Sequence, residues 1–343
     1  MQEIRQVLDP PWVLAETPEV TRSGTLLGFD VGGTKVAVCA ADAEGRILAR
    51  RRRPTASRGD VEADVRGLVA DARAVLAEAG LGPDEAPAFV GASVPGPLDA
   101  DAEHVLRPPN LPHWDRLPLR RRLEEALGAP VRLENDANAA ALAEWRFGAG
   151  RGALDLVYLT MSTGVGAGVV MGGVLQRGRD GQAGELGHVP AERDGEPCAC
   201  GLRGCFEAYL GGAAWAERLA REAPADSRVR ALGAEAPTPV HVFQAAEEGC
   251  AYALAELAGF NDILAQLCVT VSFAFAPERI VLGTIPSRAD PDLCLEPVRR
   301  AVRERVWPSH REALRIEASE LGDALPNHAG LAVALELRES RAG

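Results

Sequence analysis

One stretch of the chain, residues 184–207, restricts the local fold more than any other. It reads G-E-L-G-H-x9-C-x-C-x4-C-x-E, which is the pattern of a loop wrapped around a metal ion. His188, Cys198, Cys200 and Cys205 have the number and type of a closed tetrahedral zinc site, in which three thiolates and one imidazole fill every coordination position. We therefore expect a structural zinc ion rather than a catalytic one.

The glycines of this stretch support the metal interpretation. Gly201 and Gly204 lie between the cysteine ligands, where a backbone that wraps closely around an ion needs residues that tolerate positive φ. The alternative is a local disulfide with one spare thiol. It would need an oxidising compartment, which nothing else in the sequence indicates.

Composition limits the class of protein. The chain has 343 residues, and its hydrophobic content of 47% is enough for a substantial core and about two domains. Its 37 basic and 49 acidic residues give a net charge of −12, which disfavours a nucleic-acid surface. Residues 1–23 resemble a loose leader rather than a targeting segment, and no apolar run reaches the ~18 residues of a spanning helix. We expect a soluble, cytoplasmic protein with neither membrane nor nucleic acid as a partner.

Hydrophobic periodicity predicts two rounds of the same design. Three short strands in succession within 25–50 indicate an antiparallel meander, and βα units follow it. The strand pattern restarts at 154–171, with Gly172-Gly173 as a hairpin turn, so we predict two α/β lobes. The other predicted elements are helices at 60–79, 239–248 and 250–275, a helix ending near 127, strands at 88–94, 131–135 and 278–283, an alanine-rich helix from 136, a surface connection at 223–239 and an amphipathic helix from about Ala329.

The sequence D-V-G-G-T-K at 30–35 lies between two predicted strands and forms a hairpin turn with an acid at its entrance. Adjacent Gly32 and Gly33 allow close approach to an anion, Thr34 and the backbone amides can hold a phosphate oxygen, and Asp30 can orient hydrated Mg²⁺. An ordinary glycine turn is the alternative. The order G-T-K ahead of a strand excludes a Walker A loop, which precedes a helix.

A second glycine turn, S-T-G-V-G-A-G at 162–168, has the same character in the second predicted lobe. Two phosphate-type hairpins, one in each lobe, would clamp a nucleotide. A dinucleotide fold uses a single G-x-G-x-x-G, and neither glycine cluster has that spacing.

Asp136 is the candidate general base, because it stands at a strand-to-helix switch beside Asn135. The positive end of the helix would keep it ionised, which makes it a weak but well-placed base, as phosphoryl transfer tolerates. A plain helix cap is the alternative.

Glu185 and Glu207 flank the zinc ligands. Ionised carboxylates only accept hydrogen bonds, which matches a polyhydroxylated ligand that offers donors. His188 can act twice, with one ring nitrogen on zinc and the other donating to a substrate hydroxyl. Alternatively, both acids are solvated and His188 only holds the metal.

Four motifs together, D-V-G-G-T-K at 30–35, E-N-D-A-N at 134–138, G-E-L-G-H at 184–188 and C-x-C-G-x-x-G-C-x-E at 198–207, resemble the sugar kinases of the ROK family (repressor, open reading frame, kinase). The resemblance covers about residues 24–340. It implies an α/β protein with the actin-like ATPase fold, two RNase-H-like lobes and a central cleft for nucleotide and sugar. By this resemblance a leader at 1–23 precedes an N-terminal lobe of 24–136 plus 328–343, and 137–327 form a C-terminal lobe with the zinc loop. A homodimer is also expected.

The resemblance assigns roles by position. Asp136 would deprotonate the sugar hydroxyl that attacks the γ-phosphate of ATP, and Asp30 would hold Mg²⁺. The zinc ion would order the sugar-binding loop without taking part in the chemistry. The sugar would be bound by Asn110, Asn135, Glu185, His188 and Glu207. The nucleotide would be bound by Asp30, Gly32, Gly33, Thr34, Lys35, Thr163, Gly164 and Gly283.

The expected activity is transfer of the γ-phosphate of ATP to the 6-hydroxyl of a hexose, with glucose the first choice. The alternative activities are an N-acylmannosamine or other hexosamine kinase and a sugar-sensing regulator without turnover. The phosphoryl donor could also be another compound than ATP, such as polyphosphate. ROK repressors carry a longer N-terminal extension with a helix-turn-helix, which disfavours the regulator. The sequence departs from the family pattern at Thr284 and Ser162, where glycine is frequent, and at Gly211, where serine is frequent.

Overall fold

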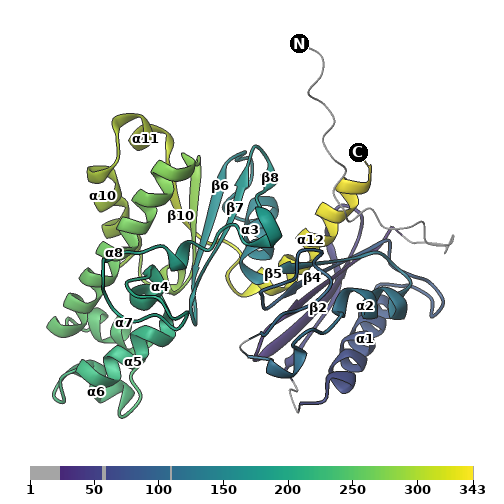
Figure 1. The fold of residues 1–343 in the computed structure, drawn as a ribbon, viewed down its shortest axis with the longest axis horizontal. Helices are drawn as coiled ribbons and strands as arrows, with labels where there is room; N and C mark the ends of the chain where they lie inside the picture. The colour runs from purple at the N-terminus through teal and green to yellow at the C-terminus, as the bar shows by residue number, and fades with distance from the viewer. Residues whose placement is uncertain (1–23, 56–58, 109, 343) are drawn as a thin grey trace. The chain divides into compact units, whose positions relative to one another are not determined.

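The computed structural model describes residues 24–55, 59–108 and 110–342, and residue contacts divide the chain into two compact units (Figure 1). The first unit comprises the chain up to Asp136, residues 178–181 and the segment from Pro326 onward. The second comprises residues 137–177 and 182–325. The leader expected at 1–23 lies outside the described residues.

The first unit contains a five-stranded sheet in the order β3-β2-β1-β4-β5. β1, β2 and β3 pair in antiparallel fashion, which confirms the expected meander, whereas β4 and β5 run parallel to β1. The strands are β1 (Leu26–Val31), β2 (Lys35–Ala41), β3 (Ile47–Pro54), β4 (Phe89–Val94) and β5 (Val131–Asn135).

Helices cover both faces of this sheet. α1 (Val61–Glu78) and α2 (Leu119–Leu127) pack on the face that carries Leu27 and Phe29, and the short 3₁₀ helix η1 (Pro112–Trp114) precedes α2. Asp60 caps α1 by accepting a hydrogen bond from the Ala63 amide at 3.0 Å, which explains where the helix begins.

The opposite face is covered by α12 (Leu325–Ala342). This helix begins four residues before the predicted position, and every residue from Ala329 to Leu335 is buried, so the prediction of an amphipathic helix was wrong for its first half. Glycines allow the close packing: a Cβ at Gly28 would lie 2.6 Å from the Leu331 nitrogen. The last helix of the chain is therefore a core element of the first unit.

The second unit repeats the strand order of the first. Its sheet has the order β10-β9-β6-β7-β8, with β6, β7 and β8 antiparallel and β9 and β10 parallel to β6. The repetition confirms two α/β lobes of like design. The strands are β6 (Leu156–Met161), β7 (Val165–Met171), β8 (Val174–Leu175), β9 (Arg279–Thr284) and β10 (Arg315–Ala318).

Most helices of this unit form its hydrophobic core with one face of the sheet. The short 3₁₀ helix η2 (Arg179–Gly181) belongs to the first unit, and α3 begins at the boundary between the units. The helical elements of the second unit are α3 (Asp136–Phe147), η3 (Leu186–His188), α4 (Phe206–Leu210), α5 (Gly212–Glu222), α6 (Arg228–Gly233), α7 (Pro239–Glu247), α8 (Ala251–Phe275), α9 (Ile285–Arg288), α10 (Leu295–Arg305), α11 (Pro308–Ala313) and η4 (Gly322–Ala324). The surface connection predicted for 223–239 was wrong in part, because it contains α6, whose Val229 is fully buried.

α8 is the longest helix of the described chain. By length and composition alone it could cross a membrane, since it has 25 residues and a mean hydropathy of 1.4 over its most apolar window. It packs against α7 and α10 and contributes Leu257, Leu264 and Val271 to the hydrophobic core. Its apolar composition is therefore used inside the second unit.

Candidate active site

A row of residues in register crosses the first sheet through Asp30. Its members are Arg52 on β3, Ala37 on β2, Asp30 on β1, Ser93 on β4 and Glu134 on β5. Paired residues of neighbouring strands share one face of a sheet, so these side chains lie side by side. Ser93 donates a hydrogen bond to Oδ1 of Asp30 at 2.7 Å.

This environment changes the pKa of the Asp30 carboxyl. Burial raises its pKa to about 6, and repulsion from Asp136 adds to the rise, while the Ser93 hydrogen bond and the Arg52 charge oppose it. At neutral pH the carboxylate is mostly ionised but poorly solvated. A cation bound beside it would replace the missing solvation.

The turn after β1 has the predicted hairpin form. Val31 pairs with Val36, the Gly32 amide donates to the Lys35 carbonyl at 2.8 Å, and Thr34 and Lys35 are exposed. Thr55, the residue after β3, holds the turn, since its hydroxyl donates to the Gly32 carbonyl at 2.7 Å. The turn is therefore presented on a fixed backbone.

The structure shows a packing reason for glycine at position 33 that the sequence did not reveal. A Cβ there would overlap the Asn110 side chain, whose Nδ2 would lie only 3.2 Å away. The glycine therefore lets Asn110 pack directly on the turn, which brings one of the predicted sugar-binding residues close to the predicted phosphate loop.

β5 leads directly into α3, as predicted. Asn135 is half-buried at the strand end and lies against Gly96, where a Cβ would be 3.5 Å from Nδ2 of Asn135. Asp136 is exposed and is the first residue of α3, at the positive end of the helix. The carboxyl ends of parallel β1, β4 and β5 thus bring Asp30, Asn135 and Asp136 to one edge of the first sheet, the usual position of ligands in open α/β sheets.

The second predicted hairpin joins β6 and β7. It is a turn of residues 162–164 only, with the Ser162 amide donating to the Gly164 carbonyl at 2.9 Å. Gly166 and Gly168, which the sequence assigned to the turn, lie within β7 instead, and a Cβ at Gly166 would be 3.0 Å from Cβ of Ala137 on α3. These two glycines serve the packing of the alanine-rich helix.

Glu207 joins the metal loop to this hairpin. Its Oε2 accepts a hydrogen bond from the Val165 amide at 2.9 Å, and its Oε1 lies 3.7 Å from Sγ of Cys198. A Cβ at Gly164 would be 3.1 Å from the carboxyl carbon of Glu207. The carboxylate predicted to bind sugar is therefore also part of the hairpin.

Gly211 has a similar explanation. A Cβ at this position would lie 2.7 Å from the Glu207 carbonyl oxygen and 3.3 Å from the Thr163 carbonyl oxygen. The close approach of α5 to the hairpin accounts for glycine here. The Ala213 amide then donates to the Thr163 carbonyl at 3.0 Å, which fixes the turn from a second side.

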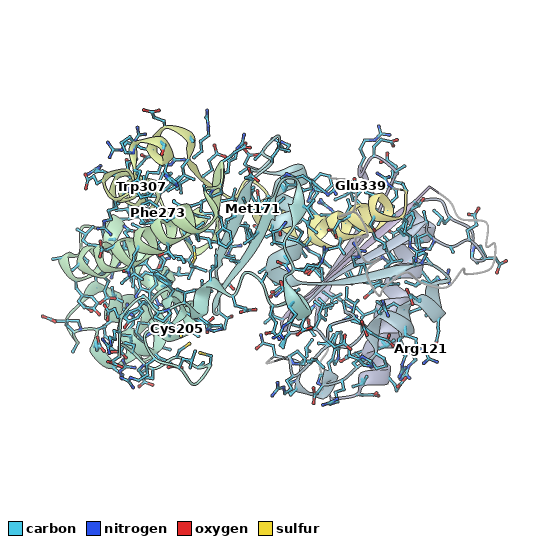
Figure 2. All side chains as sticks on the ribbon, turned by 45° about the horizontal axis from the view of Figure 1, so that its top comes forward. Arg121, Met171, Cys205, Phe273, Trp307 and Glu339 are labelled. Atoms are coloured by element: carbon cyan, nitrogen blue, oxygen red, sulfur yellow. The ribbon has the colours of Figure 1, made fainter. Side chains whose placement is uncertain are left out.

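The four predicted metal ligands converge in the second unit, where Cys205 marks their place in Figure 2. The candidate ligand atoms of His188, Cys198, Cys200 and Cys205 all lie within 4.8 Å of one another. Sγ of Cys200 is 3.8 Å from Sγ of Cys205, and Sγ of Cys198 is 3.9 Å from Nδ1 of His188. A tetrahedral zinc ion with bonds of about 2.3 Å to sulfur needs thiolates about 3.8 Å apart, so the donor set fits zinc.

The backbone around these ligands is as the sequence predicted. Gly201 and Gly204 have φ values of 92° and 73°. The other ring nitrogen of His188, Nε2, lies 3.9 Å from Oε2 of Glu185, whose side chain is exposed. A metal on Nδ1 would therefore leave Nε2 directed toward this carboxylate.

Two residues support the site but were not predicted from the sequence. Tyr209 braces the metal loop, because its hydroxyl donates to Glu192 and accepts from the Glu196 amide, both at 2.9 Å. Ser93 is the hydrogen-bond donor to Asp30. The only signal for Ser93 was a lone hydroxyl in the otherwise apolar strand F-V-G-A-S-V.

Gly283 and Thr284 end β9. A Cβ at Gly283 would be 2.7 Å from Cζ of Tyr158, so this glycine accommodates an aromatic ring. Thr284 has φ 60° and ψ −108°, a conformation that favours glycine. Its hydroxyl donates to the Met161 carbonyl and lies 3.1 Å from the Thr160 hydroxyl, which holds the threonine in place.

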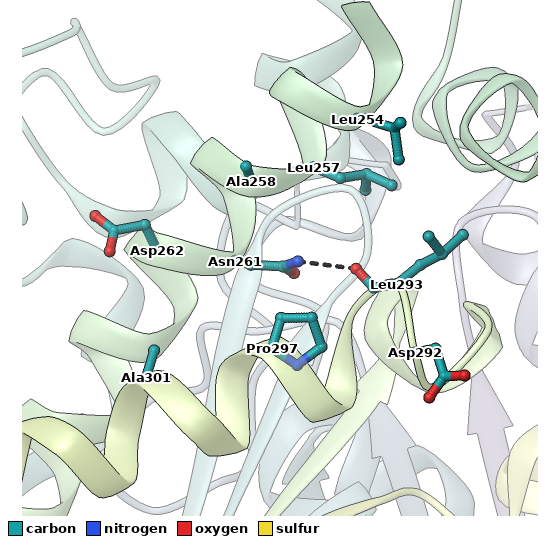
Figure 3. Close-up of a pocket in the computed structure, with 9 residues that line it drawn as sticks. All are labelled: Leu254, Leu257, Ala258, Asn261, Asp262, Asp292, Leu293, Pro297 and Ala301. Carbon is teal, nitrogen blue, oxygen red and sulfur yellow. Dashed lines mark hydrogen bonds between the residues drawn. The ribbon is translucent and has the colours of Figure 1, made fainter. Parts of the chain in front are cut away.

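A separate pocket lies between α8 and α10 (Figure 3). It has a volume of 350 Å³ and a mainly apolar lining, in which Asn261 donates to the Leu293 carbonyl at 2.8 Å. None of the predicted site residues lines it. The pocket therefore does not take part in the candidate active site.

The chain is similar to known proteins over most of its length. A glucokinase of Thermotoga maritima is 37% identical over 301 residues, which cover 86% of this chain and 92% of that protein. The crystal structure of a ROK hexokinase from Thermus thermophilus superposes with a TM-score of 0.79 at 34% identity, covering 92% of this chain and 99% of that one. A ROK family glucokinase from Streptomyces griseus, solved in complex with glucose and AMPPNP, has a TM-score of 0.73 at 33% identity and covers 92% and 100%.

The family model described as ROK matches residues 26–336, which include both sheets and every predicted site residue. The fold of the solved relatives is the actin-like ATPase fold, in agreement with the repeated strand order of the two units. This chain belongs to the ROK family.

Proposed function

We propose that this protein is a glucokinase that transfers the γ-phosphoryl group of ATP to the 6-hydroxyl of glucose. The observation that carries the proposal is the strand-end arrangement of Asp30, Ser93 and Asp136 in the first unit. The relatives named glucokinase, and the one bound to glucose and AMPPNP, favour glucose and ATP over other hexoses and donors.

Asp136 is the proposed base. It is exposed at the first turn of a 12-residue helix, where the helix dipole favours its ionised form. An ionised carboxylate can accept a proton late, when the sugar oxygen is already bonding to phosphorus, which suits the loose transition state of phosphoryl transfer.

Asp30 is the proposed magnesium residue. Bound Mg²⁺ would neutralise charge on the phosphates of ATP. The cation would in turn stabilise the ionised form of Asp30, which burial disfavours. The rigid turn at Gly32, Gly33 and Thr34 and the hairpin at Thr163 and Gly164 are the proposed phosphate contacts, with Lys35 and Gly283 at the nucleotide as well.

The sugar is assigned to Asn110, Asn135, Glu185, His188 and Glu207. Their amide and carboxylate groups supply acceptors for sugar hydroxyls, and Nε2 of His188 supplies a donor when Nδ1 holds zinc. We also propose the structural zinc ion, a cytoplasmic location and a homodimer for this protein.

An ADP-release assay over a panel of hexoses tests the proposal. We expect turnover with glucose that exceeds turnover with N-acetylmannosamine, and loss of turnover by about 10²–10⁴-fold in Asp136→Asn while glucose still binds. Asp84→Asn, which removes the same charge from an exposed turn, is the matched control. Full turnover in Asp136→Asn would remove this residue from the role, and promoter binding without ADP release on any sugar would favour a regulator.

A further inference from the structure

A second groove in the described chain has the opposite electrostatic character to the protein as a whole. It lies where α10, α11 and β10 meet and has a volume of 350 Å³. Although the chain has a net charge of −12, this groove is lined by Arg299, Arg303, Arg311, Arg315 and His310.

The acids that line the groove are already paired. Glu296 accepts from Nη1 of Arg299 at 2.6 Å, and Glu317 lies 3.6 Å from Nη1 of Arg279, which comes from the neighbouring strand. Arg299 is also fixed by a hydrogen bond from Nε to the Ile316 carbonyl at 2.7 Å. The two lining carboxylates therefore do not neutralise the positive charge of the other arginines.

Three arginines supply the excess charge. Among the residues that the structure describes, Arg303, Arg311 and Arg315 have no ion-pair partner, and they come from α10, α11 and the start of β10 respectively. Guanidinium groups that approach one cavity from separate elements repel one another unless an anion lies between them.

His310 gives an independent sign of a missing partner. Its Nδ1 is shielded from solvent and has no hydrogen-bond partner within the described part of the chain. The ring is held by aromatic contacts, with centroid distances of 5.3 Å to Phe273 and 5.8 Å to Trp307. A buried polar atom of this kind is normally satisfied by a ligand or an ordered water.

The groove is separate from the candidate site residues of its own unit. In the sheet register, Arg315 on β10 is paired with Arg279 on β9, and Arg279 is paired with Leu156 on β6. The groove therefore lies where the parallel strands β6, β9 and β10 begin. The hairpin of residues 162–164 follows the other end of β6. Figure 2 likewise shows Trp307 and Phe273 at one end of this unit and Cys205 at the other.

We propose that this groove is a second, non-catalytic binding site for a phosphate dianion, either free or as the phosphate monoester of a small metabolite. Planar guanidinium groups recognise phosphate through paired N–H donors, and His310 adds a further ring nitrogen. The groove has the volume of a small-ligand pocket, so a phosphorylated monosaccharide fits its size as well as inorganic phosphate does. The proposal does not depend on the proposed kinase activity.

Isothermal titration of the whole protein with inorganic phosphate or glucose 6-phosphate tests this site. Glucose and AMPPNP are present at saturating concentration to occupy the candidate active site under the proposed function, and the variants below locate the bound phosphate independently of that function. We expect both to bind with an affinity that falls as ionic strength rises. Tighter binding of glucose 6-phosphate would indicate a monoester as the ligand, and equal binding would indicate that the dianion alone is recognised.

The double variant Arg303→Ala/Arg311→Ala should lose at least about tenfold in affinity for both probes, because each charged hydrogen bond removed contributes about that factor or more. Its basal turnover and thermal midpoint should be unchanged, since both side chains are exposed. Arg300→Ala removes an exposed arginine of α10 that does not line the groove, and it should bind like the original chain. The proposal is overturned if neither probe binds, or if the double variant binds both as tightly as Arg300→Ala does.

Discussion

Replacing Asp30 by asparagine should stabilise the protein while it abolishes activity. Burial raises the pKa of this carboxyl from its ordinary value of 3.8 to about 6. Each pKa unit corresponds to about 1.4 kcal/mol, so keeping the carboxylate ionised in the folded chain costs about 3 kcal/mol at neutral pH. Asparagine has nearly the same shape and no charge, and it can still accept the hydrogen bond from Ser93.

The pH dependence gives this prediction its sign. Because the pKa is higher in the folded state, the folded chain binds the proton more tightly than the unfolded chain does. The cost of the carboxylate is complete above about pH 6 and disappears as the pH falls toward 3.8. The advantage of Asp30→Asn should therefore be about 3 kcal/mol at pH 7.5 and close to zero near pH 4.

Urea unfolding at both pH values, followed by far-UV circular dichroism, measures this difference. Asp84→Asn is the control, because it removes an equivalent charge from an exposed turn and should show no such gain. The reasoning is refuted if Asp30→Asn is no more stable than the original chain at pH 7.5, or if its advantage does not change with pH.

Three further predictions concern other parts of the chain. Cys205→Ser should lose the zinc measured by elemental analysis and raise the KM for glucose, whereas Cys250→Ser should leave the zinc content and the KM unchanged. Zinc retained in Cys205→Ser would contradict the ligand assignment. Ala276→Gly should raise the free energy of unfolding by about 0.5–1 kcal/mol, because Ala276 ends α8 with φ 46° and ψ 49°; an unchanged urea midpoint would argue against strain there. Gly91→Ala should lower the free energy of unfolding by about 1–3 kcal/mol or more, because its Cβ would overlap the backbone of α12. Gly259→Ala is the control, because its Cβ would meet nothing within 4 Å and should not destabilise the chain. Thermal unfolding that ranks the two variants the other way would show that α12 can shift.

The sequence predicted best those features that depend on nearby residues. The positive φ of Gly201 and Gly204, the antiparallel meander and the start of α1 beside Asp60 each follow from a few consecutive residues. The four metal ligands are equally local, since they lie within 18 residues of one another, from His188 to Cys205.

The features that sequence did not predict are contacts between distant segments. Ser93 reaches Asp30 across 63 positions, and the link from Glu207 to Val165 spans 42. For Gly33 the sequence indicates anion binding or an ordinary glycine turn, whereas the fold also requires this glycine for the approach of Asn110. No periodicity within either segment contains that information, because it arises only when the strands are paired.

The position of α12 has a consequence for how the chain is made. Gly28 and Gly91 lie in strands that are synthesised before the second unit, yet they pack against a helix that is synthesised only after it. Until then, the face of the early sheet that will receive Leu331 has no covering helix from its own unit. The second unit is synthesised before α12, whereas the first unit cannot complete its sheet packing until α12 has been made.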